Sequence, residues 1–175
     1  MPYATRKSDP DGAAAKKKTP KNAKKYLVWL VSRMEYSAAD LRKKLISKEF
    51  PIEEVDAAMA FAQLHGFQSD ERFVVSKTRN AASRQGNYRL KQKLAQKGIS
   101  SELSQAQIDT LAPEEERVLG ILRRFEGLPL DQKLREKIYR FLASRGFSSR
   151  PIKVAFAHLE AKLRENNEAE INLQD

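Results

Sequence analysis

Apolar residues in most of the chain recur every three or four positions, the spacing that places side chains on one face of a helix. Tyr26, Leu27, Leu30, Val31 and Met34 form the first such set. Patterns of this kind fill nearly the whole stretch from residue 26 to residue 163. The sequence therefore predicts an all-α protein without strands.

One block of this pattern occurs three times, as Leu41/Leu45/Phe50, Leu90/Leu94/Ile99 and Ile138/Leu142/Phe147. The first residues of these sets lie 49 and 48 positions apart. The helix after each block repeats at equal offsets, as Val55/Met59/Ala62, Ser104/Ile108/Leu111 and Ile152/Phe156/Leu159. Self-similarity at this period indicates stacked units that cannot each close a core alone. We therefore predict three tandem three-helix repeats, or roughly nine helices in all.

Polar residues and glycine mark where several of these helices begin and end. Ser37, followed three residues later by Asp40, predicts an N-cap. Gly66 predicts a C-cap, and Ser69 or Asp70 predicts the start of the next helix.

The second helix of each predicted repeat ends in a similar way. Gly98 and Gly146 each precede an apolar residue, which predicts C-caps at positive φ with that apolar residue folded back onto the helix. Glu49 stands where the first repeat would have this glycine. The first turn must therefore differ from the other two or carry strain.

Composition and pattern together divide the chain into five segments. The first 25 residues carry eight Lys or Arg against two Asp, mixed with Pro, Gly and Ala, and such a segment cannot bury enough apolar surface to fold. It either extends contact with a polyanion or is simply a solvated tail. The predicted segments are a disordered basic arm (1–23), three-helix repeats 1 (24–67), 2 (68–112) and 3 (113–164), and an acidic C-terminal tail (165–175).

The formal net charge of +10 changes the picture, because so basic a chain is expected to meet a polyanion or an acidic protein surface. The plainer alternative is a basic protein that is merely soluble. The absence of cysteine excludes disulfides and thiolate metal sites and fits the cytoplasm. No apolar run approaches the roughly 20 residues of a membrane span, and the N-terminus lacks the apolar stretch of a secretory signal. We expect a cytoplasmic protein without membrane contact.

The positive charge is concentrated in the second predicted repeat. Between residues 72 and 101 there are eight basic residues and no acidic one: Arg72, Lys77, Arg79, Arg84, Arg89, Lys91, Lys93 and Lys97. Helix surfaces usually mix the signs, because opposite charges four residues apart support a helix and like charges weaken it. Arg89, Lys93 and Lys97 would form one stripe beside Leu90 and Leu94. We interpret the stretch as a surface for an anionic partner, with a chance-basic surface as the alternative.

Few residues of the sequence are candidates for catalysis or for binding a metal or cofactor. The chain has two histidines, His65 and His158, and neither has a second ligand at metal-binding spacing. There is no phosphate-binding Gly-Lys loop and no Ser in a nucleophile setting. The run Glu114–Glu116 is better explained as a complement to a helix N-terminus than as a metal site. The sequence thus predicts no catalytic residues, no metal site and no cofactor, and we interpret the protein as a non-enzyme.

Four segments resemble the RecX family of regulators of the RecA recombinase. "EYSAADLRKKL" (35–45) resembles Tyr-Ser-x-x-Glu-Leu-x-x-Lys-Leu, with Asp40 for Glu. "GFQSDERFV" (66–74) resembles Gly-x-x-Asp-Asp-x-Arg-Phe-Ala, with Ser69 and Val74 as departures. "GNYRLKQKLAQKGIS" (86–100) and "YRFLASRGFS" (139–148) resemble the endings of the second and third units. The resemblance covers about residues 24 to 163, in order and at matching separations.

The resemblance implies an elongated, curved body of three three-helix units that lies in the groove of the RecA–DNA filament as a monomer. It further implies inhibition of RecA ATPase, strand exchange and co-protease functions. Together with the charge map, it places filament contacts at the eight basic residues above and at Arg140 and Arg145 of the third unit. DNA would be bound through its phosphates, without sequence preference and with strong salt dependence.

The alternative function is that of a general basic helical DNA-binding protein with no recombinase partner. DNA binding alone does not separate the two, because a basic regulator would also bind DNA. Inhibition of a preformed RecA filament at a salt concentration that abolishes binding to bare DNA does separate them.

Overall fold

The computed structural model describes residues 22–126, 128 and 130–172. Within these residues it contains nine α-helices, one 3-10 helix and no strand, so the all-α prediction is confirmed. The helices are α1 (Ala23–Val31), α2 (Ala38–Ile46), α3 (Ile52–Leu64), α4 (Asp70–Ala81), α5 (Asn87–Ala95), α6 (Ser101–Asp109), α7 (Glu114–Leu122), α8 (Gln132–Ser144) and α9 (Ser149–Asn172), with the 3-10 helix η1 (Arg123–Phe125) after α7.

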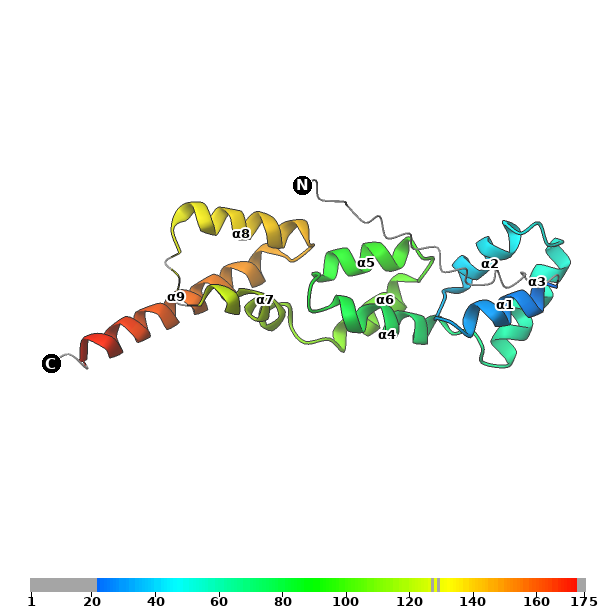
Figure 1. The fold of residues 1–175 in the computed structure, drawn as a ribbon, viewed down its shortest axis with the longest axis horizontal. Coiled ribbons are helices and arrows are strands. Elements are labelled where there is room, and N and C mark those ends of the chain that lie inside the picture. The colour runs from blue at the N-terminus through cyan, green and yellow to red at the C-terminus, as the bar shows by residue number, and fades with distance from the viewer. Residues whose placement is uncertain (1–21, 127, 129, 173–175) are drawn as a thin grey trace, which may run out of the picture.

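The helices form an elongated body in which they pack mainly in threes (Figure 1). We call these the N-terminal group (α1–α3), the middle group (α4–α6) and the C-terminal group (α7–α9). The repeat boundaries predicted after residues 67 and 112 fall between α3 and α4 and between α6 and α7. That these boundaries separate independent units stays a prediction.

The two ends of the chain bear on two further predictions. Residues 1–21 of the predicted basic arm lie outside the described residues, and α1 already begins at Ala23. The predicted acidic tail is helical as far as Asn172, because α9 continues through it, and residues 173–175 lie outside the described residues.

The repeated apolar positions form the cores. Each group buries the leucine or isoleucine pair of its second helix: Leu41 and Leu45, Leu90 and Leu94, Ile138 and Leu142. The N-terminal and C-terminal groups each have one continuous core, whereas the middle group has two small clusters, one around Phe73 and Leu94 and one around Leu90 and Ile108. The middle group therefore buries little apolar surface for its size.

Two apolar residues near helix ends, one of them Met34 of the predicted first apolar set, are exposed. Met34 is 47% exposed because α1 ends at Val31, three residues earlier than the apolar pattern suggests. Ile52 is also 47% exposed. It is the first residue of α3, and the helix face that turns inward begins one turn later, at Val55.

The turns after α5 and α8 have the predicted conformation. Gly98 and Gly146 have φ values of 75° and 82°. The amide of the following residue, Ile99 or Phe147, donates back to the carbonyl of Leu94 or Leu142 at 3.1 and 3.3 Å. Both apolar side chains are buried, as a helix C-cap of this type requires.

The corresponding turn of the N-terminal group also has a residue at positive φ, but this residue is not a glycine. Glu49 adopts a φ of 61°, which costs a residue with a Cβ roughly 1–2 kcal/mol. Both alternatives that the sequence left open therefore apply: the turn carries strain, and among the described residues no hydrogen bond joins the Phe50 amide to Leu45 as in the other two turns.

Candidate partner-binding surface

A groove of about 400 Å³ lies between α4 and α5 of the middle group. It exists because α4 offers small side chains, Thr78 and Ala81, where the two helices face each other. Apolar side chains form its floor and lysines stand on its rim; the floor is made by Phe73, Leu90 and Leu94 and the rim by Lys77, Lys93 and Lys97. Of the predicted stripe of Arg89, Lys93 and Lys97, the two lysines line the groove together with Leu90 and Leu94, and Arg89 does not.

The three rim lysines differ in their surroundings. Lys77 Nζ lies 5.4 Å from the centre of the Phe73 ring, so its aliphatic stem runs along the apolar floor. Lys97 Nζ pairs with Asp40 Oδ2 of the N-terminal group at 2.9 Å. Within the described part of the chain, Lys77 and Lys93 have no carboxylate partner.

A second, more open depression of about 530 Å³ lies on another side of α4. Arg72 and Arg79 line it together with Glu35 and Glu71. Arg72 Nε donates to Glu35 Oε1 at 3.0 Å. A hydrogen bond from the Ser69 hydroxyl, above all, lowers the pKa of Glu71 from its ordinary value, so this carboxyl is ionised at neutral pH. The charges of this depression largely compensate one another.

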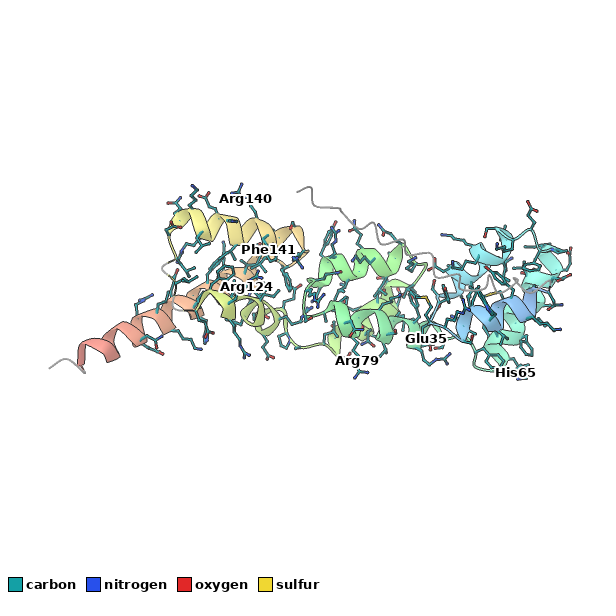
Figure 2. All side chains as sticks on the ribbon, in the orientation of Figure 1. Glu35, His65, Arg79, Arg124, Arg140 and Phe141 are labelled. Carbon is teal, nitrogen blue, oxygen red and sulfur yellow. The ribbon has the colours of Figure 1, made fainter. Side chains whose placement is uncertain are left out.

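The ten predicted contact residues do not share one face. Figure 2 places Arg79 on the lower edge of the molecule, below α4, and Arg140 on the upper edge, above α8. Arg84, Arg89 and Lys91 are exposed near the start of α5 and outside the groove. Of the ten, Lys77, Lys93 and Lys97 line the groove, and Arg72 and Arg79 line the second depression, where carboxylates accompany them.

The interface between the N-terminal and middle groups, here called the first interface, consists of polar contacts near the start of α2. Asp70, the first residue of α4, accepts a 2.9 Å hydrogen bond from the amide of Ala38, the first residue of α2. The exposed ion pairs of Arg72 and Lys97 lie on the same interface. A Cβ on Gly98 would stand 2.6 Å from the Cβ of Ala39, so this turn rests directly on α2.

The interface between the middle and C-terminal groups, the second interface, repeats this arrangement one group later. Glu114, the first residue of α7, accepts from the amide of Asn87, the first residue of α5. The same carboxylate accepts from the Ser148 hydroxyl at 2.6 Å. Gly86 N donates to Arg145 O at 3.0 Å, which brings the turn after α8 onto the start of α5.

A buried arginine completes the second interface. Arg117 of α7 is 8% exposed and donates to the carbonyls of Ala82 and Gln85 at 3.0 and 2.9 Å, and to the Asn87 side chain. Burial lowers the pKa of its guanidinium from the ordinary value, while the carboxylates of Glu114 and Glu115 oppose the shift. The residue stays charged at neutral pH, because an arginine does not deprotonate in this range.

Comparison with known proteins identifies the family to which this arrangement belongs. Residues 69–106, which include α4 and α5, match the family described as "RecX, second three-helix domain". The regulatory protein RecX of Actinobacillus pleuropneumoniae (serotype 5b) is 38% identical over 128 residues, covering 70% of this chain and 82% of the relative. The chain belongs to the RecX family. The regulatory protein RecX of Pasteurella multocida is likewise 38% identical, over 77% of this chain and 86% of its own length.

Solved structures show the same fold for this RecX family member. The crystal structure of RecX from Lactobacillus salivarius superposes with a TM-score of 0.68 at 16% identity, over 79% of this chain and 95% of that one. A crystal structure of a regulatory protein RecX gives a TM-score of 0.63 at 21% identity, over 77% and 70% of the two chains.

Several residues of this RecX family member have roles that sequence reasoning missed. Arg72, Lys97 and Arg145, predicted as partner contacts, also join neighbouring groups: Arg145 Nη1 donates to Arg84 O at 3.3 Å. Glu114, predicted only as a complement to its own helix, also accepts from the first amide of α5 in the middle group. The sequence contained one feature that could have indicated the roles of Lys97 and Arg145. Each is the basic residue directly before the glycine of a repeated turn, Gly98 or Gly146.

The described residues offer little for other chemistry. In residues 22–126, 128 and 130–172 no three His, Asp or Glu side chains gather as a metal site would require. None of the helices described is both long and apolar enough to traverse a lipid bilayer. Figure 2 shows His65 on the edge of the N-terminal group, and its ring lies 4.5 Å from that of Phe61.

Proposed function

We propose that the protein regulates the RecA recombinase by binding the RecA–DNA filament and inhibiting its ATPase, strand exchange and co-protease activities. It acts as a cytoplasmic monomer, and α4 and α5 of the middle group provide the main electrostatic contact. Phosphates of the filament DNA are bound without sequence preference. Membership in a family of regulatory proteins supports the regulatory part of this proposal.

One observation carries the partner-binding part. Lys77 and Lys93 stand on facing helices around an open groove, and neither has a carboxylate partner within the described residues. Concentrating like charges in this way weakens the middle group by itself, because the ammonium groups repel one another. An anionic partner removes that repulsion when it binds.

The test is a titration of the full-length protein into preformed RecA filaments while ATP hydrolysis is measured. The salt concentration is set at the value where binding of the protein to bare DNA is lost, since phosphate contacts weaken steeply with salt. Inhibition that persists at this salt supports regulation of RecA. Inhibition that disappears together with DNA binding supports a general DNA-binding protein instead.

The double variant Lys77→Glu/Lys93→Glu locates the contact. Both side chains are exposed, so the variant is expected to fold. The protein concentration required for inhibition should rise by at least about tenfold. The matched control is Lys43→Glu/Lys48→Glu, which makes the same change in net charge on exposed positions of the N-terminal group. Equal loss in both variants would show that only net charge matters.

A further inference from the structure

We propose that the groove between α4 and α5 binds an acidic peptide segment of a partner protein. One large apolar side chain of that segment occupies the groove floor, and carboxylates on either side of it face Lys77 and Lys93. The inference rests on the proposed function, which makes this surface the partner-binding one. It goes further by assigning the groove to the protein part of the filament and not to its DNA.

The floor of the groove determines the kind of ligand. Phe73, Leu90 and Leu94 present apolar atoms there, and Thr78 and Ala81 leave the space above them open. A volume of about 400 Å³ accommodates a leucine or phenylalanine side chain and falls within the range of small-ligand pockets. A sugar–phosphate backbone has no large apolar group to place in such a cavity, so DNA bound through its phosphates would leave the floor unfilled.

The rim determines the charge of the ligand. Lys77 projects from α4 and Lys93 from α5, so cations stand on both walls of the groove. An ammonium group on a flexible stem follows a carboxylate as a point charge, without the fixed geometry that an arginine imposes. A peptide with acidic residues before and after its apolar residue meets one lysine on each wall.

Segments of the same chain do not fit this description. The basic N-terminal arm carries eight Lys or Arg in its first 25 residues and is repelled by the rim lysines. The acidic residues near the C-terminus belong to a chain end that α9 carries to the far end of the molecule, away from α4 and α5 (Figure 1). The occupant therefore comes from another molecule.

The experiment measures binding of two fluorescein-labelled hexapeptides to the full-length protein by fluorescence anisotropy. One peptide has the sequence Glu-Glu-Leu-Phe-Glu-Glu, and the other replaces Leu-Phe by Ser-Ser at the same charge. We expect the Leu-Phe peptide to bind at least about tenfold more tightly, because it buries large apolar side chains on the floor. In ¹⁵N NMR spectra it should shift the amides of Thr78, Ala81 and Leu94.

Two variants of different kinds check the site. Lys77→Glu/Lys93→Glu should abolish binding of both peptides, and Lys43→Glu/Lys48→Glu should leave it unchanged. Ala81→Leu fills the groove without changing the charge, so it should remove the preference for the Leu-Phe peptide. Ala81 is only half-buried, and thermal unfolding followed by circular dichroism establishes whether this variant keeps its fold.

Four results would overturn the inference. Equal affinity for the two peptides would mean that the groove acts only as a charged surface. If single-stranded oligo-dT shifts the same three amides, the groove binds DNA instead. Self-association of the protein that Lys77→Glu/Lys93→Glu abolishes assigns it to a second copy of the chain. Folded Ala81→Leu protein that inhibits RecA as well as the wild type removes the groove from regulation but leaves the proposed function intact. Conversely, a wild-type protein that never inhibits RecA at high salt contradicts the proposed function, while peptide binding remains measurable.

Discussion

The two interfaces between helix groups have the same arrangement of contacts but differ in how deeply these contacts are buried. In each, the first residue of one group is a carboxylate that accepts from the first amide of the preceding group's second helix. At the first interface the further contacts are exposed ion pairs, Arg72–Glu35 and Lys97–Asp40. At the second, Arg117 is buried and donates from its two terminal nitrogens to two carbonyls and the Asn87 side chain.

This difference has an energetic meaning. Exposed ion pairs contribute about 0–1 kcal/mol each and weaken with salt, because water and ions compete for both partners. A buried charge is costly unless every partner remains in place, and removal of one partner typically costs about 3–5 kcal/mol. We therefore expect the second interface to fix the C-terminal group firmly against the middle group. The first interface should allow the N-terminal group to reorient.

The largest expected effect comes from Arg117→Met. The variant leaves the Ala82 and Gln85 carbonyls and the Asn87 side-chain oxygen without their donor and the buried Glu114 without its cation, and the free energy of unfolding should fall by about 3 kcal/mol. Urea unfolding followed by circular dichroism measures it. Arg123→Met, at an exposed position of η1, is the control and should change little. A loss below about 1 kcal/mol would mean that the buried arginine does not set this interface apart.

The next largest effect is expected for Gly86→Ala. A Cβ at this position overlaps the carbonyl of Gly146 across the second interface, which should cost about 2 kcal/mol because the two backbones must separate. Gly120→Ala is the matched control, because a Cβ there meets nothing within 4 Å. Placed inside α7, that alanine should raise stability by up to about 1 kcal/mol. Thermal unfolding of both variants under one set of conditions decides the matter.

A smaller effect of opposite sign is expected for Glu49→Gly. The turns at Gly98 and Gly146 rest on a preceding group, so they have no room for a side chain, whereas no helix group described in the structure precedes the one that contains Glu49. Only the strain of its positive φ remains there, and glycine should relieve it, raising the free energy of unfolding by about 1 kcal/mol. Lys48→Gly, one residue earlier, should lower stability instead, and no gain for Glu49→Gly would contradict the prediction.

The smallest effect concerns the first interface. Arg72→Gln removes the ion pair with Glu35 and should lower stability by less than about 1 kcal/mol at low salt. At high salt the difference should vanish, because exposed charges are screened. The loss in Arg117→Met should persist at both salt concentrations. If the loss of stability in Arg72→Gln were the same at low and high salt, this ion pair would behave like the buried contacts of Arg117, contrary to the prediction.

The sequence predicted what depends on neighbouring residues and missed what depends on which helices meet. The leucine pairs, the glycine turns and the caps at Ser37 and Ser69 follow from local spacing, and the structure confirms them. Lys93 and Lys97 line the groove with Leu90 and Leu94, as their spacing in one short stretch indicated, whereas Arg89 of the same predicted stripe lies outside it. Lys77 completes the groove from a different helix, which periodicity alone does not reveal.

The interface residues show the same limit. In the sequence, Arg117 is one of twelve basic residues between positions 113 and 164. Its acceptors lie 30 to 35 residues away, so nothing local distinguishes it from its exposed neighbours. Lys97 looked like a free cation for the same reason, since Asp40 belongs to the preceding group.

The start of α5 depends on a helix that follows it in the chain. Its N-cap is Gly86, which has no side chain to accept an amide, and its first turn contains no acidic residue. The acceptor for the Asn87 amide is supplied by Glu114. As the protein emerges from the ribosome, one wall of the groove therefore stays unanchored until α7 has been made. A nascent chain stopped before that point would carry all the rim lysines and yet display no finished surface.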